Sequence, residues 1–109
     1  MAKKIFFSFI LSLMTGYTLF AQADLTDANV MGHVIDKTTN EHIAYVTIRL
    51  VGTSYGTMTD ATGHYFLKNI PDGDYEIEAT YIGYVSQKFK VRIKGRRTQE
   101  VNFSLKEDV

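Results

Sequence analysis

The 109-residue chain contains no cysteine, and Pro71 is its only proline. Without cysteine there can be no disulfide, no thiolate zinc site, no cysteine nucleophile and no lipid anchor on an N-terminal cysteine. An excess of one charge is also absent, because 12 Lys and Arg residues oppose 12 Asp and Glu residues. This balance argues against a polybasic protein that binds nucleic acid.

The N-terminus has the pattern of a secretory signal peptide. Lys3 and Lys4 precede an apolar stretch over residues 5–13, and the sequence Ala-Gln-Ala ending at Ala23 fits the small-x-small cleavage pattern. The apolar run is shorter than the about 20 residues that a membrane span needs. We therefore expect a signal peptide over residues 1–23, cleaved after residue 21 or 23, and export of the remainder without direct membrane insertion.

Loss of the leader removes Lys3 and Lys4, which leaves ten basic and twelve acidic residues and a net charge of −2. The remaining chain is long enough for one small domain, which buries about 60% of its surface. We expect a flexible lead-in over residues 24–28, one domain over 29–106 and the start of a linker at 107–109.

Short runs of alternating apolar and polar residues fill this domain, with turn residues between them. This period of two is typical of half-buried strands, and no run after the leader has a helical period. The sequence predicts an all-β fold, an antiparallel β-sandwich of about seven strands. The residues expected to face the core are Val30, Gly32, Val34, Val46, Ile48, Leu50, Tyr65, Leu67, Tyr75, Ile77, Ala79, Tyr81, Phe89, Val91, Ile93, Val101, Phe103 and Leu105.

The strongest charge feature is a basic stripe on the outward positions of residues 88–97. The preceding strand carries Glu76 and Glu78 on its outward face, so a hairpin would place opposite charges side by side. We expect these two glutamates to pair with Lys88, Lys90 and Arg92, which favours a solvated strand face over nucleic-acid contact. The residues left as a possible interaction surface are Lys94, Arg96, Arg97 and the turn residue Tyr84.

The stretch 56–67, GTMTDATGHYFL, offers Asp60 and His64 as candidate chemical groups. A structural interpretation is stronger, because a carboxylate can accept hydrogen bonds from the backbone N–H groups just after it and so close a turn. Gly56 and Gly63 would supply backbone freedom. The residues expected to form structural turns are Gly56, Asp60, Gly63, Pro71, Gly73 and Gly83.

No catalytic or metal-binding motif is evident. His33, His42 and His64 lack the paired spacing of metal ligands, and no Gly-x-Ser-x-Gly turn is present. The sequence predicts no cofactor, no metal and no enzymatic site.

Residues 30–84 resemble the carboxypeptidase regulatory-like domain, a transthyretin-like β-sandwich. The resemblance rests on Gly-x-Val-x-Asp at 32–36, Gly-Thr at 52–53, Gly-Thr-x-Thr-Asp-x-x-Gly-x-Tyr-x-Leu at 56–67, Pro-x-Gly-x-Tyr at 71–75 and Tyr-x-Gly-Tyr at 81–84. One departure is EHIAY at 41–45, where family members often carry proline. The motif is specific for a fold and weak for a function.

The resemblance implies a non-enzymatic periplasmic domain at the N-terminus of a TonB-dependent outer-membrane receptor for nutrients. Its partner would be the plug and barrel of that receptor, in the same chain or as a separate protein. An alternative is a free-standing secreted β-sandwich that binds protein or glycan. Transthyretin-like folds also include a purine-pathway hydrolase, but its C-terminal Tyr-Arg-Gly-Ser is not matched by the ending KEDV.

Overall fold

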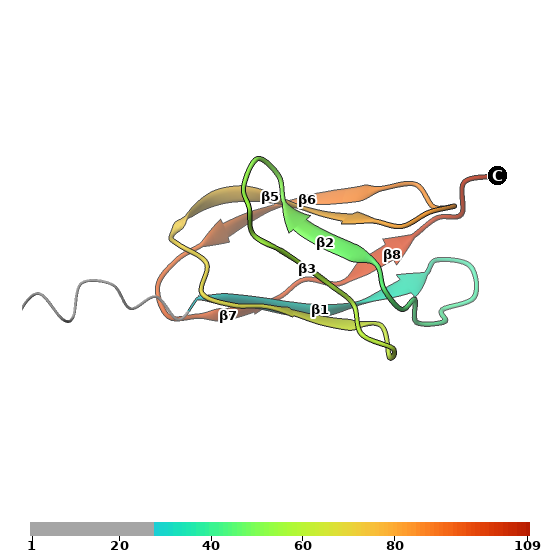
Figure 1. Cartoon of the computed structure of the whole chain (residues 1–109), viewed down its shortest axis with the longest axis horizontal. Coiled ribbons are helices and arrows are strands. Elements are labelled where there is room, and N and C mark those ends of the chain that lie inside the picture. Colours follow the sequence, from blue (N-terminus) through green and yellow to red (C-terminus); the bar gives the residue numbers. More distant parts are fainter. Residues whose placement is uncertain (1–27) are drawn as a thin grey trace, which may run out of the picture.

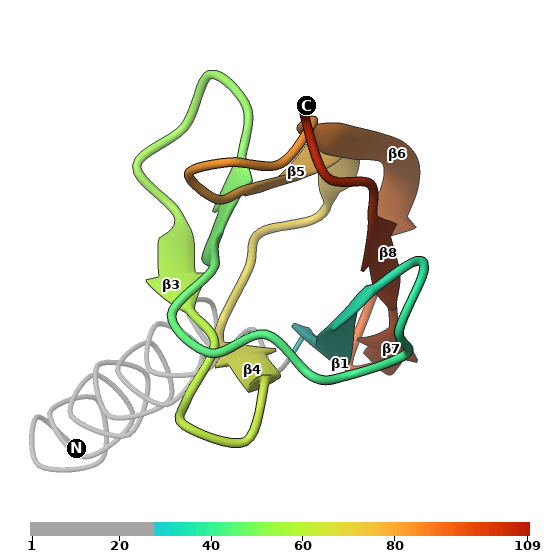
Figure 2. The same ribbon diagram turned by 90° about the vertical axis from the view of Figure 1, so that its right-hand side faces the viewer.

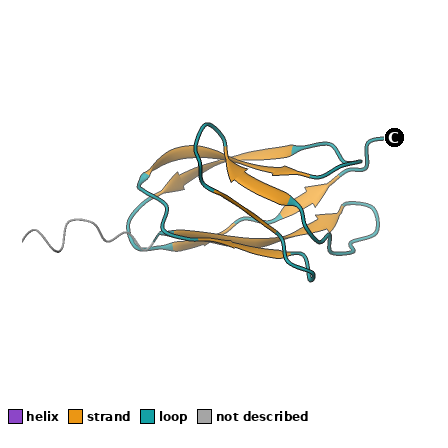
Figure 3. Cartoon of the chain, viewed as in Figure 1, coloured by secondary structure: helices purple, strands orange, loops and turns teal. Residues whose placement is uncertain are grey.

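The computed structural model describes residues 28–109; the expected signal peptide and residues 24–27 of the lead-in lie outside this part of the chain. The described part contains strands and loops and no helix (Figure 3), which confirms the predicted all-β fold. The strands are β1 (Asn29–Asp36), β2 (Thr47–Leu50), β3 (Gly56–Met58), β4 (His64–Leu67), β5 (Gly73–Thr80), β6 (Gln87–Ile93), β7 (Thr98–Glu100) and β8 (Phe103–Leu105).

The strands form two packed layers. One sheet has the order β4-β1-β7, with β8 also paired to β1, and the other has the order β3-β2-β5-β6. Figure 2 looks along the sandwich and shows β5 and β6 in one layer and β4, β1 and β7 in the other. The described chain begins at one end of the sandwich and ends at the other (Figure 1).

Alternation decides which side chains fill the space between the layers. Val46, Ile48 and Leu50 are completely buried, as the period of two predicts. Phe89 is the least buried of the expected inward residues, with 38% of its surface exposed, because β6 is an edge strand of its sheet. Four core residues lie outside the strands, Ala28, Ile43, Val46 and Ile70. Of these, alternation identified only Val46.

The sequence predicted an antiparallel sandwich, but not all strand pairs are antiparallel. β1 pairs in parallel with both β7 and β8, and antiparallel with β4. The short segment between β7 and β8 contains Val101 and lies against β1 at Gly32. Only glycine fits there, because a Cβ at position 32 would lie 1.9 Å from the carbonyl oxygen of Val101. The β5–β6 hairpin has the predicted register, with Glu78 opposite Lys88 and Glu76 opposite Lys90.

Packing and hydrogen bonds reach beyond the expected limits of the domain at both ends. Ala28 has 1% of its surface exposed, and its carbonyl oxygen accepts a hydrogen bond of 2.9 Å from the N–H of Ile70. At the other end, the N–H of Val85 donates to Lys106 and the N–H of Asp108 donates to Gly83, at 2.8 and 2.9 Å. The sandwich therefore holds residues at both of its boundaries by backbone contacts.

Thr59 is the buried polar residue of the core, with 1% of its surface exposed. Its hydroxyl accepts a hydrogen bond of 2.8 Å from the N–H of Val46 and donates one of 3.0 Å to the carbonyl oxygen of Ile43. The segment before β2 is thereby joined to the segment that passes from β3 to β4. Burial of the hydroxyl is tolerated because both its donor and its acceptor are used.

The turn between β3 and β4 is organised by Asp60. Its Oδ1 accepts hydrogen bonds from the N–H groups of Thr62 (2.9 Å) and His64 (3.1 Å) and from the Thr62 hydroxyl (2.6 Å). These bonds, the one from Thr62 first, hold the pKa of the Asp60 carboxyl below its ordinary value. Gly63 follows with φ of +81°, so the turn uses Asp60 as a structural acceptor.

The other expected turn residues have different local roles. Gly56 has no positive φ, but a Cβ there would lie 3.2 Å from the carbonyl oxygen of Ile48. Asn69, rather than Gly73, takes the positive φ before β5, and the Tyr75 hydroxyl donates to the Pro71 carbonyl oxygen at 2.8 Å. Gly83, in the turn between β5 and β6, has φ of +85°.

Replacement of Thr59 by Val should lower the free energy of unfolding by about 2 kcal/mol or more, because each buried backbone group that loses its partner costs about 1–3 kcal/mol. Urea unfolding followed by circular dichroism measures this. Thr57→Val is the matched control, because the Thr57 side chain makes no hydrogen bond in the described structure and lies on the neighbouring strand β3. Equal losses in the two variants would contradict the role given to the buried hydroxyl.

Gly63→Ala should destabilise the fold more than Gly83→Ala. Both positions have a positive φ, for which a residue with a Cβ costs about 1–3 kcal/mol. At Gly63 the new Cβ would also lie 2.7 Å from the Cβ of His42, whereas at Gly83 no atom lies within 4 Å. The difference between the urea-unfolding midpoints of the two variants measures the destabilisation caused by the steric clash with His42. Equal shifts of the two midpoints would show that the destabilisation comes from backbone strain alone.

Stability should fall as the pH drops below about 3.8, since the folded-state pKa of Asp60 lies below its ordinary value of 3.8. A carboxyl with a depressed folded pKa stabilises the fold above its unfolded pKa, and this contribution is lost as the pH falls through the folded pKa. Asp60→Asn should therefore reduce the acid dependence of urea unfolding between neutral pH and pH about 2. Asp108→Asn, which removes an exposed carboxylate without a side-chain hydrogen bond in the described structure, should leave it unchanged.

Candidate functional site

The four residues expected to form an interaction surface do not lie together. Arg97 lies beside the start of β1, where its carbonyl oxygen accepts a hydrogen bond of 2.9 Å from the N–H of Asn29. Tyr84 lies beside the end of β1, where its hydroxyl donates to Asp36 at 2.7 Å. Since β1 runs the length of the sandwich (Figure 1), the basic loop and Tyr84 are at opposite ends of the domain.

The side chain of Tyr84 is held by a hydrogen bond within the fold. Its hydroxyl contacts Oδ2 of Asp36, while Oδ1 of the same carboxylate accepts the N–H groups of Thr38 and Thr39 at 2.8 and 3.1 Å. The hydrogen bond from Tyr84 is the main cause that lowers the pKa of Asp36, and the same bond raises the pKa of Tyr84 to about 12. Tyr84 therefore ties the β5–β6 turn to the end of β1.

The basic loop contains Lys94, Arg96 and Arg97, all of which are exposed. The N–H of Gly95 within this loop donates to Oδ1 of Asp72 at 3.0 Å. Arg96 has an interaction partner of its own, and the expectation that the three cations are not neutralised stays a prediction.

The charged face of the sheet β3-β2-β5-β6 is neutralised in a different way from the one predicted. Glu78 lies between two cations, with Arg49 at 3.6 Å and Lys88 at 3.9 Å. The prediction for Lys88 is thus confirmed, but Arg92 pairs with Asp74 at 3.0 Å and not with a glutamate. Glu76 and Lys90 are opposite in the register, although they form no ion pair in the described part of the chain. Exposed pairs of this kind contribute about 0–1 kcal/mol each.

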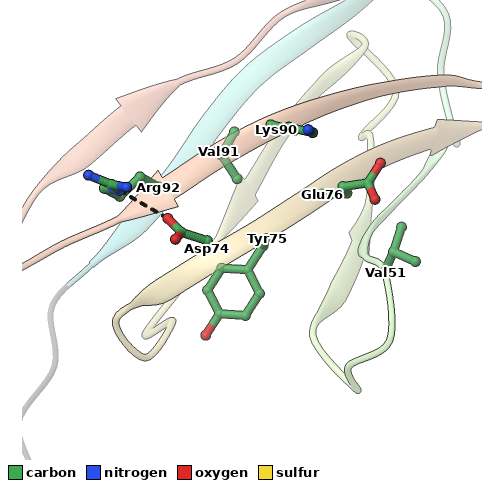
Figure 4. Close-up of a pocket in the computed structure, with 7 residues that line it drawn as sticks. All are labelled: Val51, Asp74, Tyr75, Glu76, Lys90, Val91 and Arg92. Carbon is green, nitrogen blue, oxygen red and sulfur yellow. Dashed lines mark hydrogen bonds and ion pairs between the residues drawn. The ribbon is translucent and has the colours of Figure 1, made fainter.

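An open groove of about 650 Å³ lies over the β5–β6 hairpin. Figure 4 shows its lining: Asp74 and Arg92 are joined by their ion pair, and the Tyr75 ring points away from them. The residues that line it are Val51, Asp74, Tyr75, Glu76, Lys90, Val91 and Arg92. None of these is a serine, cysteine or histidine, so the groove holds no nucleophile and base of the kind used in acyl transfer.

Sequence spacing missed a cluster of three histidines on the outside of the sheet that contains β1 and β4. His33 lies on β1 and is paired in register with His64 on β4, and His42 comes from the loop before β2. The ring centroids are 5.2 Å apart for His33 and His42, 5.8 Å for His33 and His64, and 5.1 Å for His42 and His64. Strand pairing brings His33 and His64 together, and the loop before β2 adds His42, so the spacing in the sequence did not reveal the cluster.

Two features are absent from residues 28–109. No group of three or more His, Cys, Asp or Glu side chains among these residues could hold a metal ion. None of the same residues forms a helix of the length and hydrophobicity that would cross a membrane.

Solved structures with a similar fold belong to proteins of different kinds. The 5-hydroxyisourate hydrolase of Klebsiella pneumoniae superimposes with a TM-score of 0.59 at 18% identity, over 78% of this chain and 93% of that one. A chain of a type II cohesin–X-dockerin complex from Acetivibrio cellulolyticus gives a TM-score of 0.58 at 22% identity, over 69% of this chain and 51% of that one. At these identities the likeness shows the transthyretin-like sandwich fold and no function.

The sequence comparisons identify the family. TonB-dependent receptor P3 of Formosa agariphila is 32% identical over 89 residues, which are 82% of this chain and 8% of the receptor. The chain thus matches a small part of that receptor's length. The family described as the CarboxypepD_reg-like domain matches residues 30–109, as the motifs of the sequence indicated. The chain belongs to the CarboxypepD_reg-like domain family.

Proposed function

We propose that this chain is a non-enzymatic accessory domain of a TonB-dependent outer-membrane nutrient receptor, exported by a signal peptide at residues 1–23 and located in the periplasm. The observation that carries the proposal is the 32% identity to TonB-dependent receptor P3 over 82% of this chain, together with the family match over residues 30–109. The domain's partner is the membrane-embedded part of the receptor, in the same polypeptide or as a separate protein.

The arrangement of the chain ends suits a domain inserted in line within a longer assembly. The described part begins at Ala28, beside Ile70, and ends beside the turn that contains Gly83. These two places are at opposite ends of the sandwich (Figure 1).

A hydrolase function has little support in the described residues. The groove over β5 and β6 lacks a nucleophile and a histidine. The three histidines lie on β1, on β4 and before β2, outside the residues that line this groove. An accessory role needs no such groups, because binding can rely on exposed strands and loops.

Cell fractionation tests the proposal directly. The natural host is fractionated, and an antibody against the sandwich detects the protein. We expect it in the outer-membrane or periplasmic fraction, protected from added protease in intact cells and digested once the outer membrane is permeabilised. The N-terminal sequence of the protein should begin at Gln22 or Asp24.

Deletion of residues 29–106 from the receptor assembly is the matching genetic test. It should reduce growth on the imported nutrient while the membrane-embedded part remains at its normal level, measured with a separate antibody. Detection of the chain in the cytosolic fraction, with residues 1–23 still attached, would overturn the proposal. Its release into the medium as a free domain would instead support the secreted binding protein.

A further inference from the structure

The turn between β5 and β6 exposes two branched apolar side chains. Ile82 has 90% of its surface exposed and Val85 has 50%. Turns favour Gly, Pro, Asn, Asp and Ser, whereas β-branched residues favour pleated, half-buried strands. The conformation of the turn therefore gives no reason for isoleucine and valine at these positions. Together Ile82 and Val85 form an apolar tip at one end of the sandwich (Figure 1).

The backbone of this turn is fixed within the fold. The N–H of Tyr84 donates a hydrogen bond of 3.2 Å to the carbonyl oxygen of Tyr81, and Gly83 between them has φ of +85°. The Tyr84 hydroxyl donates to Asp36 at 2.7 Å, and the ring centroids of Tyr81 and Tyr84 are 5.9 Å apart. Ile82 thus projects from a backbone that is already in place, so a partner that binds it loses little affinity to the ordering of the turn.

The last described residues of the chain lie along the same turn. The N–H of Val85 donates to the carbonyl oxygen of Lys106 at 2.8 Å, and the N–H of Asp108 donates to that of Gly83 at 2.9 Å. Figure 1 shows the C-terminal end beside the β5–β6 turn. A polypeptide joined to Val109 would therefore leave the sandwich next to the apolar tip.

The surroundings of the apolar tip resemble the rim of a protein interface. Protein interfaces combine an apolar centre with a polar, solvent-accessible rim. Lys106, Glu107 and Asp108 are exposed on the segment that runs along the turn. Two carboxylates and one ammonium group do not suit an anionic lipid surface, which attracts clusters of Lys and Arg. The chemistry of the tip therefore favours a protein partner over a membrane surface.

Two other exposed apolar sites serve as a comparison. Met31 and Phe66, each 43% exposed, are opposite in register on β1 and β4, and the Lys68 ammonium group lies 5.8 Å from the centre of the Phe66 ring. Met58 is 53% exposed on β3. In the described part of the chain, the backbone hydrogen bonds of residues 106–108 go to the β5–β6 turn and not to these strands. Only the apolar tip combines exposure with proximity to the end of the chain.

We propose that the apolar tip is the surface through which this domain docks on the membrane-embedded part of the receptor, an inference that rests on the proposed function. The matched part is 8% of the length of TonB-dependent receptor P3, so a receptor of that kind has much more chain with which the domain can make contact. The partner surface is an apolar pocket that receives Ile82, with polar groups opposite the charges of residues 106–108. The basic loop then points away from the contact, because it lies at the other end of β1 (Figure 1).

Photo-cross-linking in the receptor assembly of the natural host tests the contact. A photoactivatable phenylalanine analogue is encoded at position 82, and mass spectrometry identifies the peptide to which it is joined. We expect a peptide of the membrane-embedded part from position 82 and none from position 58, where Met58 is an exposed apolar residue of the same sheet. Cross-links from position 82 to lipid or to a second copy of the domain would overturn the proposal.

Ile82→Asp separates docking from folding. Because the Ile82 side chain is exposed, the variant should keep the urea-unfolding midpoint of the original chain. It should reduce cross-linking from the analogue at position 85 by about tenfold or more, as loss of an anchor residue at the centre of an interface does. Met58→Asp is the matched control and should leave this cross-linking unchanged. Equal cross-linking in Ile82→Asp and the original chain would contradict the docking role.

Fractionation of the same cells distinguishes failure of this inference from failure of the proposed function. A chain found with the outer membrane that gives no cross-link from position 82 would overturn the docking surface and leave the accessory role intact. A chain absent from the outer-membrane and periplasmic fractions would overturn both.

Discussion

The hydroxyl of Thr59 is the contact on which the arrangement of the two sheets depends. It lies where the chain leaves the sheet of β3 and crosses to the sheet of β4, and there it satisfies the N–H of Val46 and the carbonyl oxygen of Ile43. Tyr45, between these two residues, has φ of 63°, a conformation that costs about 1–3 kcal/mol for a residue of this size. The two hydrogen bonds of Thr59, with the bond of 3.1 Å from the Tyr45 N–H to the Thr59 carbonyl oxygen, hold that strained segment in place.

Side-chain amides close the opposite side of the sandwich. β6 is the edge of its sheet, and an unpaired edge can join to another chain. The Gln87 side-chain oxygen accepts a hydrogen bond of 3.0 Å from the N–H of Ser104, and the Gln99 amide donates to the carbonyl oxygen of Arg92. β6 is thereby linked to β8 and to β7 without a regular ladder. The two sheets are thus joined on the side of β3 and β4 by a threonine, and on the side of β6 by two glutamines.

Alternation was sufficient to predict which face of a strand is buried, but it could not say which strands are neighbours. Residues such as Ile48 and Ile77 were assigned to the core correctly because the period of two is a local property. The register of the β5–β6 hairpin also followed, since a short turn fixes it. The parallel pairing of β1 with β7 and β8 depends on contacts about 70 residues apart, for which the sequence carries no local signal.

The histidine cluster was missed for the same physical reason. His33 and His64 meet through strand pairing, and His42 joins them because Gly63 leaves space beside its ring. Asp60 was assigned to a turn, and the structure gives its carboxylate the acceptor role in that turn. The same carboxylate also receives the Thr62 proton and so determines which nitrogen of His64 is free. Fold and surface are therefore coupled at one residue: a change at Asp60 that loosens the turn also removes the acceptor of the Thr62 hydroxyl, which contacts the His64 ring.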